Sequence, residues 1–193
     1  MAPEIRRSKR RVGASVLDMP RTRRLLEQIR TDAPEVEVLR LHHYLGPGVG
    51  TVVIDAVLDA LIENSNCQAL YIQNFNDGFG DKQLLALAKV LGMGNIWCLN
   101  AGENYRVSLA AWWDFAQELQ QTKVTHAYIS DHVIPSALKH AMRKAIRDNR
   151  CKHTRHNKAS NIHVIRQCKN MWWNPINSRA LRNELRPEAV SES

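Results

Sequence analysis

The chain has 193 residues, of which 44% are hydrophobic, and it carries a formal net charge of +8 with a pI near 9.6. A chain of this length can bury its own core, so disulfide or metal staples are not needed to stabilise it. No uninterrupted apolar run approaches the roughly 20 residues that span a bilayer, which excludes an integral membrane protein with transmembrane helices.

The charge is distributed unevenly along the chain. Residues 1–30 carry a net +6, residues 31–138 a net −7 and residues 139–186 a net +11, so an acidic middle lies between two basic ends. The four cysteines form no CxxC pair and no spacing typical of a disulfide framework, and the start of the chain has no apolar leader. These features predict a reduced, intracellular protein, either cytoplasmic or nuclear.

The first 35 residues are expected to form a tail and a cap. Residues 1–16 contain the basic cluster RRSKRR without sustained periodicity, which is typical of a disordered tail. Residues 17–35 place Leu25, Leu26 and Ile29 at helical spacing. We expect this helix to cover the open end of the units that follow.

Four similar units make up residues 36–150. An apolar pattern starts at Val36, Cys67, Ile96 and Val124, so successive starts are 31, 29 and 28 residues apart. Such a period indicates stacked repeats. Each unit begins with a short strand, and the strand residues expected to face the core are Leu39, Leu41, Leu70, Ile72, Leu99, Ala101, Ala127 and Ile129.

A helix follows each strand and carries its apolar residues on one face. The expected inward residues are Val53, Val57, Leu58, Leu61, Leu84, Leu87, Ala88, Leu91, Leu109, Trp112, Phe115, Ala116, Leu119, Leu138, Met142 and Ile146. Gly92 is the expected end of the second helix. Stacked units would place the strands in a parallel sheet, about 4.8 Å apart.

The unit LxxLxLxxN followed by a helix resembles the leucine-rich repeat of the ribonuclease-inhibitor type over residues 36–150. The resemblance implies an α/β solenoid with short parallel strands on the concave face, helices on the convex face and helical caps. In that family the Asn of the motif satisfies backbone groups in the turn that leaves the strand. Only Asn104 keeps this residue here. The other three units replace it with Tyr44, Phe75 and His132.

Residues 151–186 lack the strand pattern and are expected to form a C-terminal helical cap, followed by a disordered tail at 187–193. Cys151, His153 and His156 are residue types that bind zinc, but their spacing matches no common zinc finger. We therefore predict no metal site and no cofactor.

The strand residues between the core positions form the first candidate binding surface, because side chains alternate along a strand. Tyr and Arg in such a row suit protein recognition. Alternatively, the row is polar only because it faces water. The predicted partner-binding residues are Arg40, His42, Tyr71, Gln73, Asn100, His126, Tyr128 and Ser130.

The basic ends form a second candidate surface, for nucleic acid. Its predicted contacts are Arg143, Lys144, Arg147 and Arg150, although such residues can also be a helix's ordinary solvent face. No GxSxG, HExxH, P-loop or GxGxxG motif is present, so no catalytic residue is predicted. The sequence thus predicts a non-enzymatic protein-interaction module, with nucleic-acid binding as the alternative.

Overall fold

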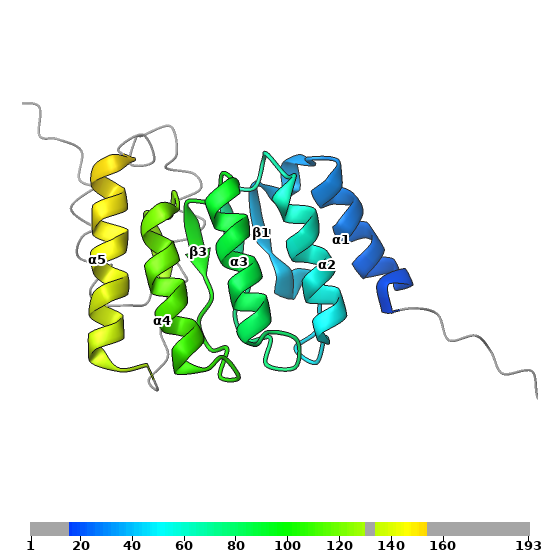
Figure 1. The fold of residues 1–193 in the computed structure, drawn as a ribbon. Coiled ribbons are helices and arrows are strands. Elements are labelled where there is room, and N and C mark those ends of the chain that lie inside the picture. Colours follow the sequence, from blue (N-terminus) through cyan, green and yellow to red (C-terminus); the bar gives the residue numbers. More distant parts are fainter. Residues whose placement is uncertain (1–15, 130–133, 154–193) are drawn as a thin grey trace, which may run out of the picture.

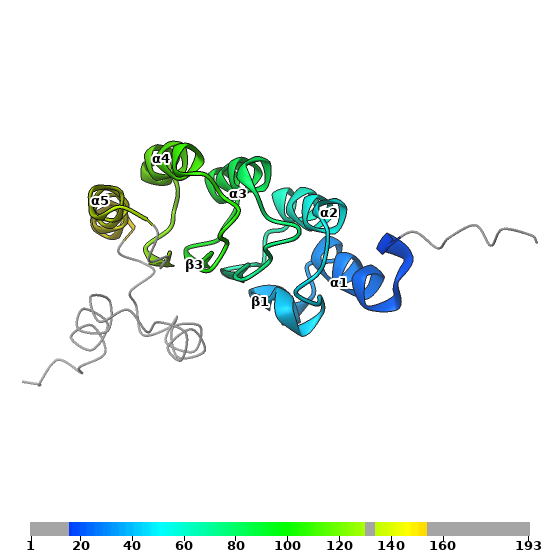
Figure 2. The same ribbon diagram turned by 90° about the horizontal axis from the view of Figure 1, so that it is seen from below.

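The computed structural model describes residues 16–129 and 134–153, which form a parallel sheet flanked by helices (Figure 1). The strands are β1 (Val38–Arg40), β2 (Ala69–Tyr71), β3 (Cys98–Asn100) and β4 (His126–Tyr128), and they lie in sequence order. The helices are α1 (Pro20–Arg30), α2 (Thr51–Ile62), α3 (Asp81–Met93), α4 (Leu109–Glu118) and α5 (Ser136–Lys152). Short 3-10 helices are η1 (Val16–Asp18), η2 (Pro34–Glu37), η3 (Leu41–His43) and η4 (Leu119–Gln121). Figure 2 shows the strands in one layer and the helices α2 to α5 in a second layer beside it.

The register of the sheet follows the repeat period of the sequence. Val38 pairs with Ala69, Ala69 with Cys98, and Cys98 with His126, which gives offsets of 31, 29 and 28 residues. The predicted period is therefore confirmed. Because the offsets match the spacing of the apolar residues, the core positions of all four strands line up across the sheet: Leu39, Leu70, Leu99 and Ala127.

The core lies between the sheet and the helices, where one contiguous cluster of buried apolar side chains runs through all four units. Leu58, Leu87, Phe115 and Met142 are buried members of it from four successive helices. Burial of each such side chain contributes roughly 1.5–3 kcal/mol, so these rows dominate stability. The predicted helix faces are confirmed with one exception: Leu109 is 44% exposed, because it is the first residue of α4.

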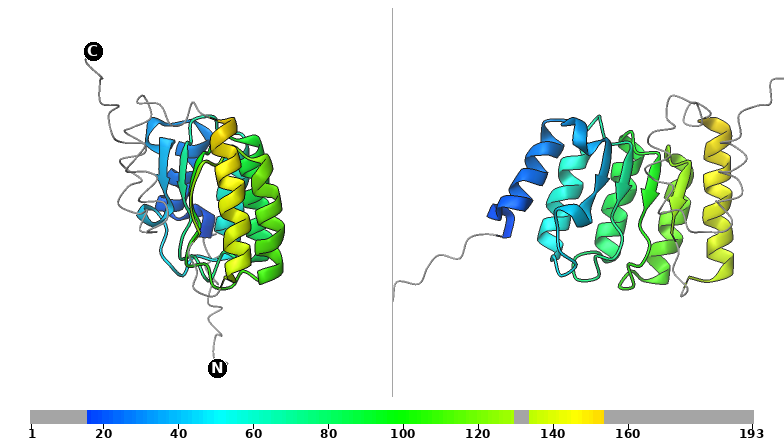
Figure 3. Two further views of the ribbon diagram at one scale, coloured as in Figure 1. Left: turned by 90° about the vertical axis from the view of Figure 1, so that its left-hand side faces the viewer. Right: turned by 180° about the vertical axis from the view of Figure 1, so that it is seen from behind.

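The ends of the stack differ slightly from the prediction. Leu25, Leu26 and Ile29 of α1 are buried and α1 packs against α2, as expected of an N-terminal cap. Helix α3 continues to Met93, so the expectation that Gly92 ends this helix is wrong. Helix α5 closes the other end of the described chain (Figure 3) and includes residues 151 and 152. The predicted C-terminal cap otherwise falls outside the described residues.

Asn104 satisfies backbone groups as the resemblance implies. Its amide nitrogen donates to the carbonyls of Ile72 at 2.8 Å and Ala101 at 3.0 Å, and its oxygen accepts from the Phe75 amide at 2.9 Å. The side chain thus joins the turns of two neighbouring units. Phe75, at the equivalent position of the preceding unit, is buried in the core instead. His132 lies outside the described residues.

Polar side chains also connect the loops that lead into successive strands. Asp32, at φ 51°, accepts from the Ser65 amide at 2.9 Å and from the Ser65 hydroxyl at 2.8 Å. Asn95 donates to the Ser65 carbonyl at 2.8 Å and accepts from Lys123 at 3.2 Å. The hydroxyl and amide of Ser65 hold the pKa of the Asp32 carboxyl below its usual value. Each loop is therefore anchored to the next loop along the stack.

Candidate functional site: the strand face

The predicted row across the strand face is present in the structure. Arg40 pairs in register with Tyr71, Tyr71 with Asn100, and Asn100 with Tyr128. The Arg40 guanidinium carbon lies 5.3 Å from the Tyr71 ring centroid, a cation–π geometry. The four strands therefore bring these side chains to one face, as side-chain alternation predicts.

The middle of this face is not open to solvent, which corrects the expectation of a water-facing row. Tyr71 and His126 are each 1% exposed and Asn100 is 4% exposed. Ala69 and Cys98 are also buried, and neither they nor Tyr71 belong to the core cluster between the sheet and the helices. Alternation predicts the direction of a side chain, but it does not predict its exposure.

Asn100 is engaged within the protein. Its side-chain nitrogen donates to the Gln73 side-chain oxygen, and its own oxygen accepts from the Gly102 amide at 3.2 Å. Gln73 and Tyr128 are half-buried. Ser130, the remaining predicted contact on this side of the sheet, lies outside the described residues. Two of the polar side chains that looked available to a partner therefore bind each other.

A chain of polar and aromatic side chains crosses the sheet just ahead of the strands. The Gln68 amide donates to Glu37 at 3.0 Å, and the Trp97 indole donates to the Gln68 side-chain oxygen at 3.0 Å. The Trp97 and His126 rings meet edge to face with centroids 5.4 Å apart. Sequence reasoning missed this chain, although the first three members stand 31 and 29 residues apart, at the repeat period.

The β1 end of the strand face is the accessible part. Here a cavity of about 300 Å³ opens beside the edge strand. Its lining residues are Pro34, Glu35, Glu37, Val38, Arg40, His43 and Tyr44. His42, an exposed member of the predicted set, lies next to it in sequence and contacts the His43 ring at a centroid distance of 4.5 Å. The edge strand β1 and the flanking 3-10 helices η2 and η3 thus bring two carboxylates, a guanidinium and an aromatic ring to one opening.

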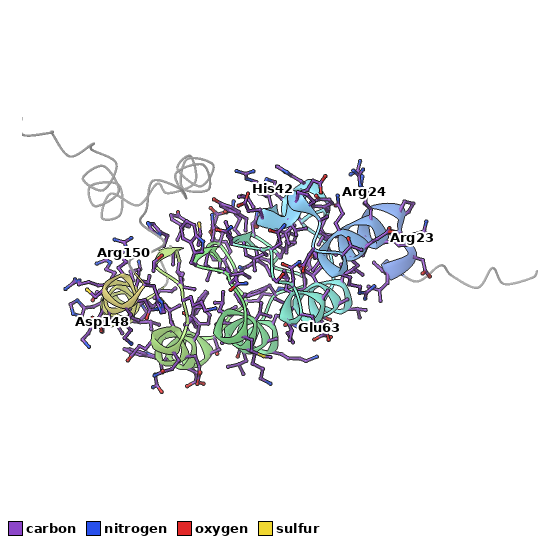
Figure 4. The ribbon with its side chains drawn as sticks, turned by 90° about the horizontal axis from the view of Figure 1, so that it is seen from above. Arg23, Arg24, His42, Glu63, Asp148 and Arg150 are labelled. Atoms are coloured by element: carbon purple, nitrogen blue, oxygen red, sulfur yellow. The ribbon has the colours of Figure 1, made fainter. Side chains whose placement is uncertain are left out.

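The pKa of His42 is lowered, first by its partial burial and then by electrostatic interaction with the neighbouring His43 and Arg40. The imidazole of His42 is therefore neutral at pH 7. Figure 4 shows His42 on the strand side of the molecule, near β1. The acidic and basic side chains that line this end of the face are Glu35, Glu37, Arg40 and His43.

Three of the four predicted nucleic-acid contacts lie on accessible parts of α5. Lys144 is exposed and lies 3.5 Å from the Asp148 carboxylate, while Arg143 is half-buried and Arg147 exposed. Arg150 is different, because its Nε donates to the Thr125 carbonyl at 2.6 Å. Arg150 therefore ties α5 to the loop before β4, which gives it a structural role.

The cysteines and histidines bring together no metal site in the residues described. Cys67 and Cys98 are buried, and burial raises the pKa of the Cys67 thiol to about 12. Cys151 is exposed on α5, His153 follows that helix, and His156 lies outside the described residues. Within residues 16–129 and 134–153, no group of three or more His, Cys, Asp or Glu side chains could hold a metal ion. In the same residues no helix is both long and apolar enough to cross a membrane.

No protein-family model and no curated protein matches the sequence. Solved structures with a similar chain path include the C-terminal domain of a tropomodulin from Caenorhabditis elegans, with a TM-score of 0.46 and 12% identity over 71% of this chain and 99% of that one. Another is leiomodin-1 actin-binding site 2, with a TM-score of 0.48 and 12% identity over 81% of this chain and 99% of that one. Because both TM-scores are below 0.5, we infer neither a family nor a partner from them.

Proposed function

We propose that the chain is a non-enzymatic leucine-rich-repeat solenoid that binds a protein partner at the β1 end of its strand face. The observation that carries this proposal is the cavity of about 300 Å³ beside β1, which Arg40 of the predicted binding face lines together with other charged and aromatic side chains. The register of the sheet and the hydrogen bonds of Asn104 support the leucine-rich-repeat assignment. The ribonuclease-inhibitor subtype rests on the repeat length.

The cavity is suited to anchoring side chains of a partner. Its volume is at the lower end for ligand pockets, which is room for about one or two side chains. The Arg40 guanidinium lies over the Tyr71 ring, and Glu37 accepts a hydrogen bond from the Gln68 side-chain amide. Both charged side chains are therefore partly ordered before a partner binds. Such preorganisation lowers the entropic cost of association. The partner would therefore insert polar or charged anchors here.

The test compares two double variants that remove the same residue types. Glu35→Ala with His43→Ala alters two exposed positions of the cavity, whereas Glu63→Ala with His140→Ala alters two exposed positions that do not line it. The full-length protein captures partners from an extract of its source cells, and each purified partner is then titrated by calorimetry. Tyr71 is unsuitable for this test, because truncating a buried ring would also destabilise the fold.

We expect the cavity variant to bind roughly tenfold more weakly, in line with the loss of about 1–2 kcal/mol at a binding hot spot. The control variant should bind as the wild type does, and both should keep the wild-type melting temperature. Equal affinities of the two variants would exclude the β1 cavity as the binding site.

A second candidate function is nucleic-acid binding through α5. It is favoured by Arg143 and Arg147, which lie one turn apart and have no ion pair or hydrogen bond in the described part of the chain. Guanidiniums one turn apart can each contact a phosphate, so the affinity should fall steeply with salt. Charge reversal at both residues and at Lys144 should abolish a shift of labelled RNA or DNA. Retained binding in this triple variant would rule out α5.

A further inference from the structure

Helix α1 presents an arginine-rich face at the end of the stack that is opposite α5. Arg21, Arg23, Arg24 and Arg30 are all exposed, and Glu27 is the acidic residue of this helix. None of the four guanidiniums has an ion pair or a hydrogen bond in the structure over the residues it describes. Figure 4 shows Arg23 and Arg24 on α1, with Asp148 and Arg150 at the far end. The helix therefore carries four arginines and one glutamate, a net charge of +3.

Two apolar side chains stand beside these arginines. Met19 is 56% exposed and Val16 is 48% exposed, although both are large hydrophobic residues. The Arg23 amide donates to the Met19 carbonyl at 2.9 Å, which places Met19 one turn below Arg23 at the start of α1. Val16 and Asp18 belong to η1 and Met19 is the N-cap of α1, so apolar area, one carboxylate and the arginines adjoin at the start of α1.

We propose that this face of α1, made by Val16, Met19 and the four arginines, binds an acidic segment of a protein partner that also carries apolar side chains. The planar guanidinium pairs with carboxylates through two parallel hydrogen bonds, so arginine suits an acidic peptide. Val16 and Met19 gain by being covered with apolar side chains, which a peptide supplies and a phosphate backbone does not.

Nucleic acid fits the same face less well. Glu27 lies among the arginines and would face the high charge density of a phosphate backbone, whereas a peptide can place a neutral or basic residue opposite it. Helix α1, with the sequence PRTRRLLEQIR, has no aromatic side chain on which a base could stack. The charge and the composition of the face therefore favour a peptide.

This surface does not depend on the proposed function of the β1 cavity. The cavity is lined by two carboxylates, Glu35 and Glu37, and an acidic segment would be repelled there. Variants of the two surfaces can therefore be tested separately, and loss of one activity leaves the other intact.

The test measures fluorescence anisotropy of a labelled synthetic peptide of Glu and Asp residues interspersed with leucines, titrated with the full-length protein. Arg23→Gln with Arg24→Gln removes two charges from α1, and the matched control Lys89→Gln with Arg106→Gln removes two from exposed positions outside α1 and α5. We expect the α1 variant to bind about twofold to thirtyfold more weakly, from about 0.2–1 kcal/mol for each of two exposed ion pairs. The control, which lowers the net charge equally, should change the affinity by less than about twofold, since only the general electrostatic attraction is reduced.

A second pair of measurements separates the apolar part of the face from its charge. Met19→Ser should weaken binding of the leucine-containing peptide and leave binding of an all-acidic peptide unchanged. Thermal melts monitored by circular dichroism check that each variant remains folded. Equal losses in the α1 variant and in its matched control would overturn the proposal. So would tighter binding of a DNA duplex, or of vesicles containing phosphatidylserine, than of the peptide.

Discussion

Replacing Asn104 by Ala tests the claim that one side chain joins two neighbouring turns. The residue is 1% exposed and makes three hydrogen bonds to backbone groups, to Ile72, Ala101 and Phe75. Alanine would leave two carbonyls and one amide without this partner in a buried place. At about 0.5–1.5 kcal/mol net for each bond, the expected loss of unfolding free energy is roughly 2–4 kcal/mol.

The measurement is urea unfolding followed by circular dichroism. For an m value of about 2 kcal/mol/M, the midpoint should fall by roughly 1–2 M. Asn95→Ala serves as the control, because Asn95 also makes two side-chain hydrogen bonds but is exposed. Its loss should stay below about 1 kcal/mol, since water replaces the lost partners. A loss below about 1 kcal/mol in Asn104→Ala, or losses of similar size in both variants, would refute the assigned role of Asn104.

Three further outcomes can be measured on the same protein. Gly78→Ala should lower the free energy of unfolding by about 1–3 kcal/mol, because a Cβ at this position would lie 2.5 Å from a backbone oxygen of a neighbouring loop. Gly92 lies inside α3, and a Cβ there would meet nothing within 4 Å, so Gly92→Ala should raise the free energy of unfolding by up to about 1 kcal/mol. Urea unfolding measures both. The Asp32→Asn variant should be less stable than the wild type at neutral pH, because the lowered pKa of Asp32 in the folded protein means that its ionised carboxylate stabilises the fold. The difference in stability should vanish as the pH falls below 3.8 and the carboxylate becomes protonated in the folded protein. A constant difference from pH 7 to pH 2 would contradict this. A thiol reagent at pH 8 should modify the exposed Cys151 in the native protein, and it should modify the buried Cys67, whose pKa is about 12, only after denaturant is added. Peptide mass spectrometry locates the modified cysteines. Labelling of Cys67 in the native protein would show that it is not buried.

The two proposed binding surfaces lie at the same end of the stack, on α1 and beside β1, and they differ in their chemistry. The cavity beside β1 offers carboxylates and a guanidinium, and α1 offers arginines beside apolar side chains. The intervening loops are held by hydrogen bonds such as that between Asp32 and Ser65. The proposed binding at this end would use a scaffold whose neighbouring turns are already fixed.

The architecture was predictable because its determinants are local and periodic. The apolar starts at Val36, Cys67, Ile96 and Val124 predict the strand register, since only side chains at that spacing can line up across a sheet. Asn104 was predictable for a related reason, as its role depends on the turn that its own repeat forms. The exposure of Leu109 was not predictable, because helical spacing alone does not indicate at which residue a helix begins.

The binding surface, by contrast, was decided by the tertiary structure. Alternation correctly placed Arg40, Tyr71 and Asn100 in one row, but it could not predict that Tyr71 and Asn100 are buried. The contacts of Gln68 with Glu37 and Trp97 join residues about a full repeat apart, and the β1 cavity forms only where two 3-10 helices flank an edge strand. Sequence periodicity determines which residues stand side by side. Exposure, and therefore the accessible site, depends on packing between segments distant along the chain.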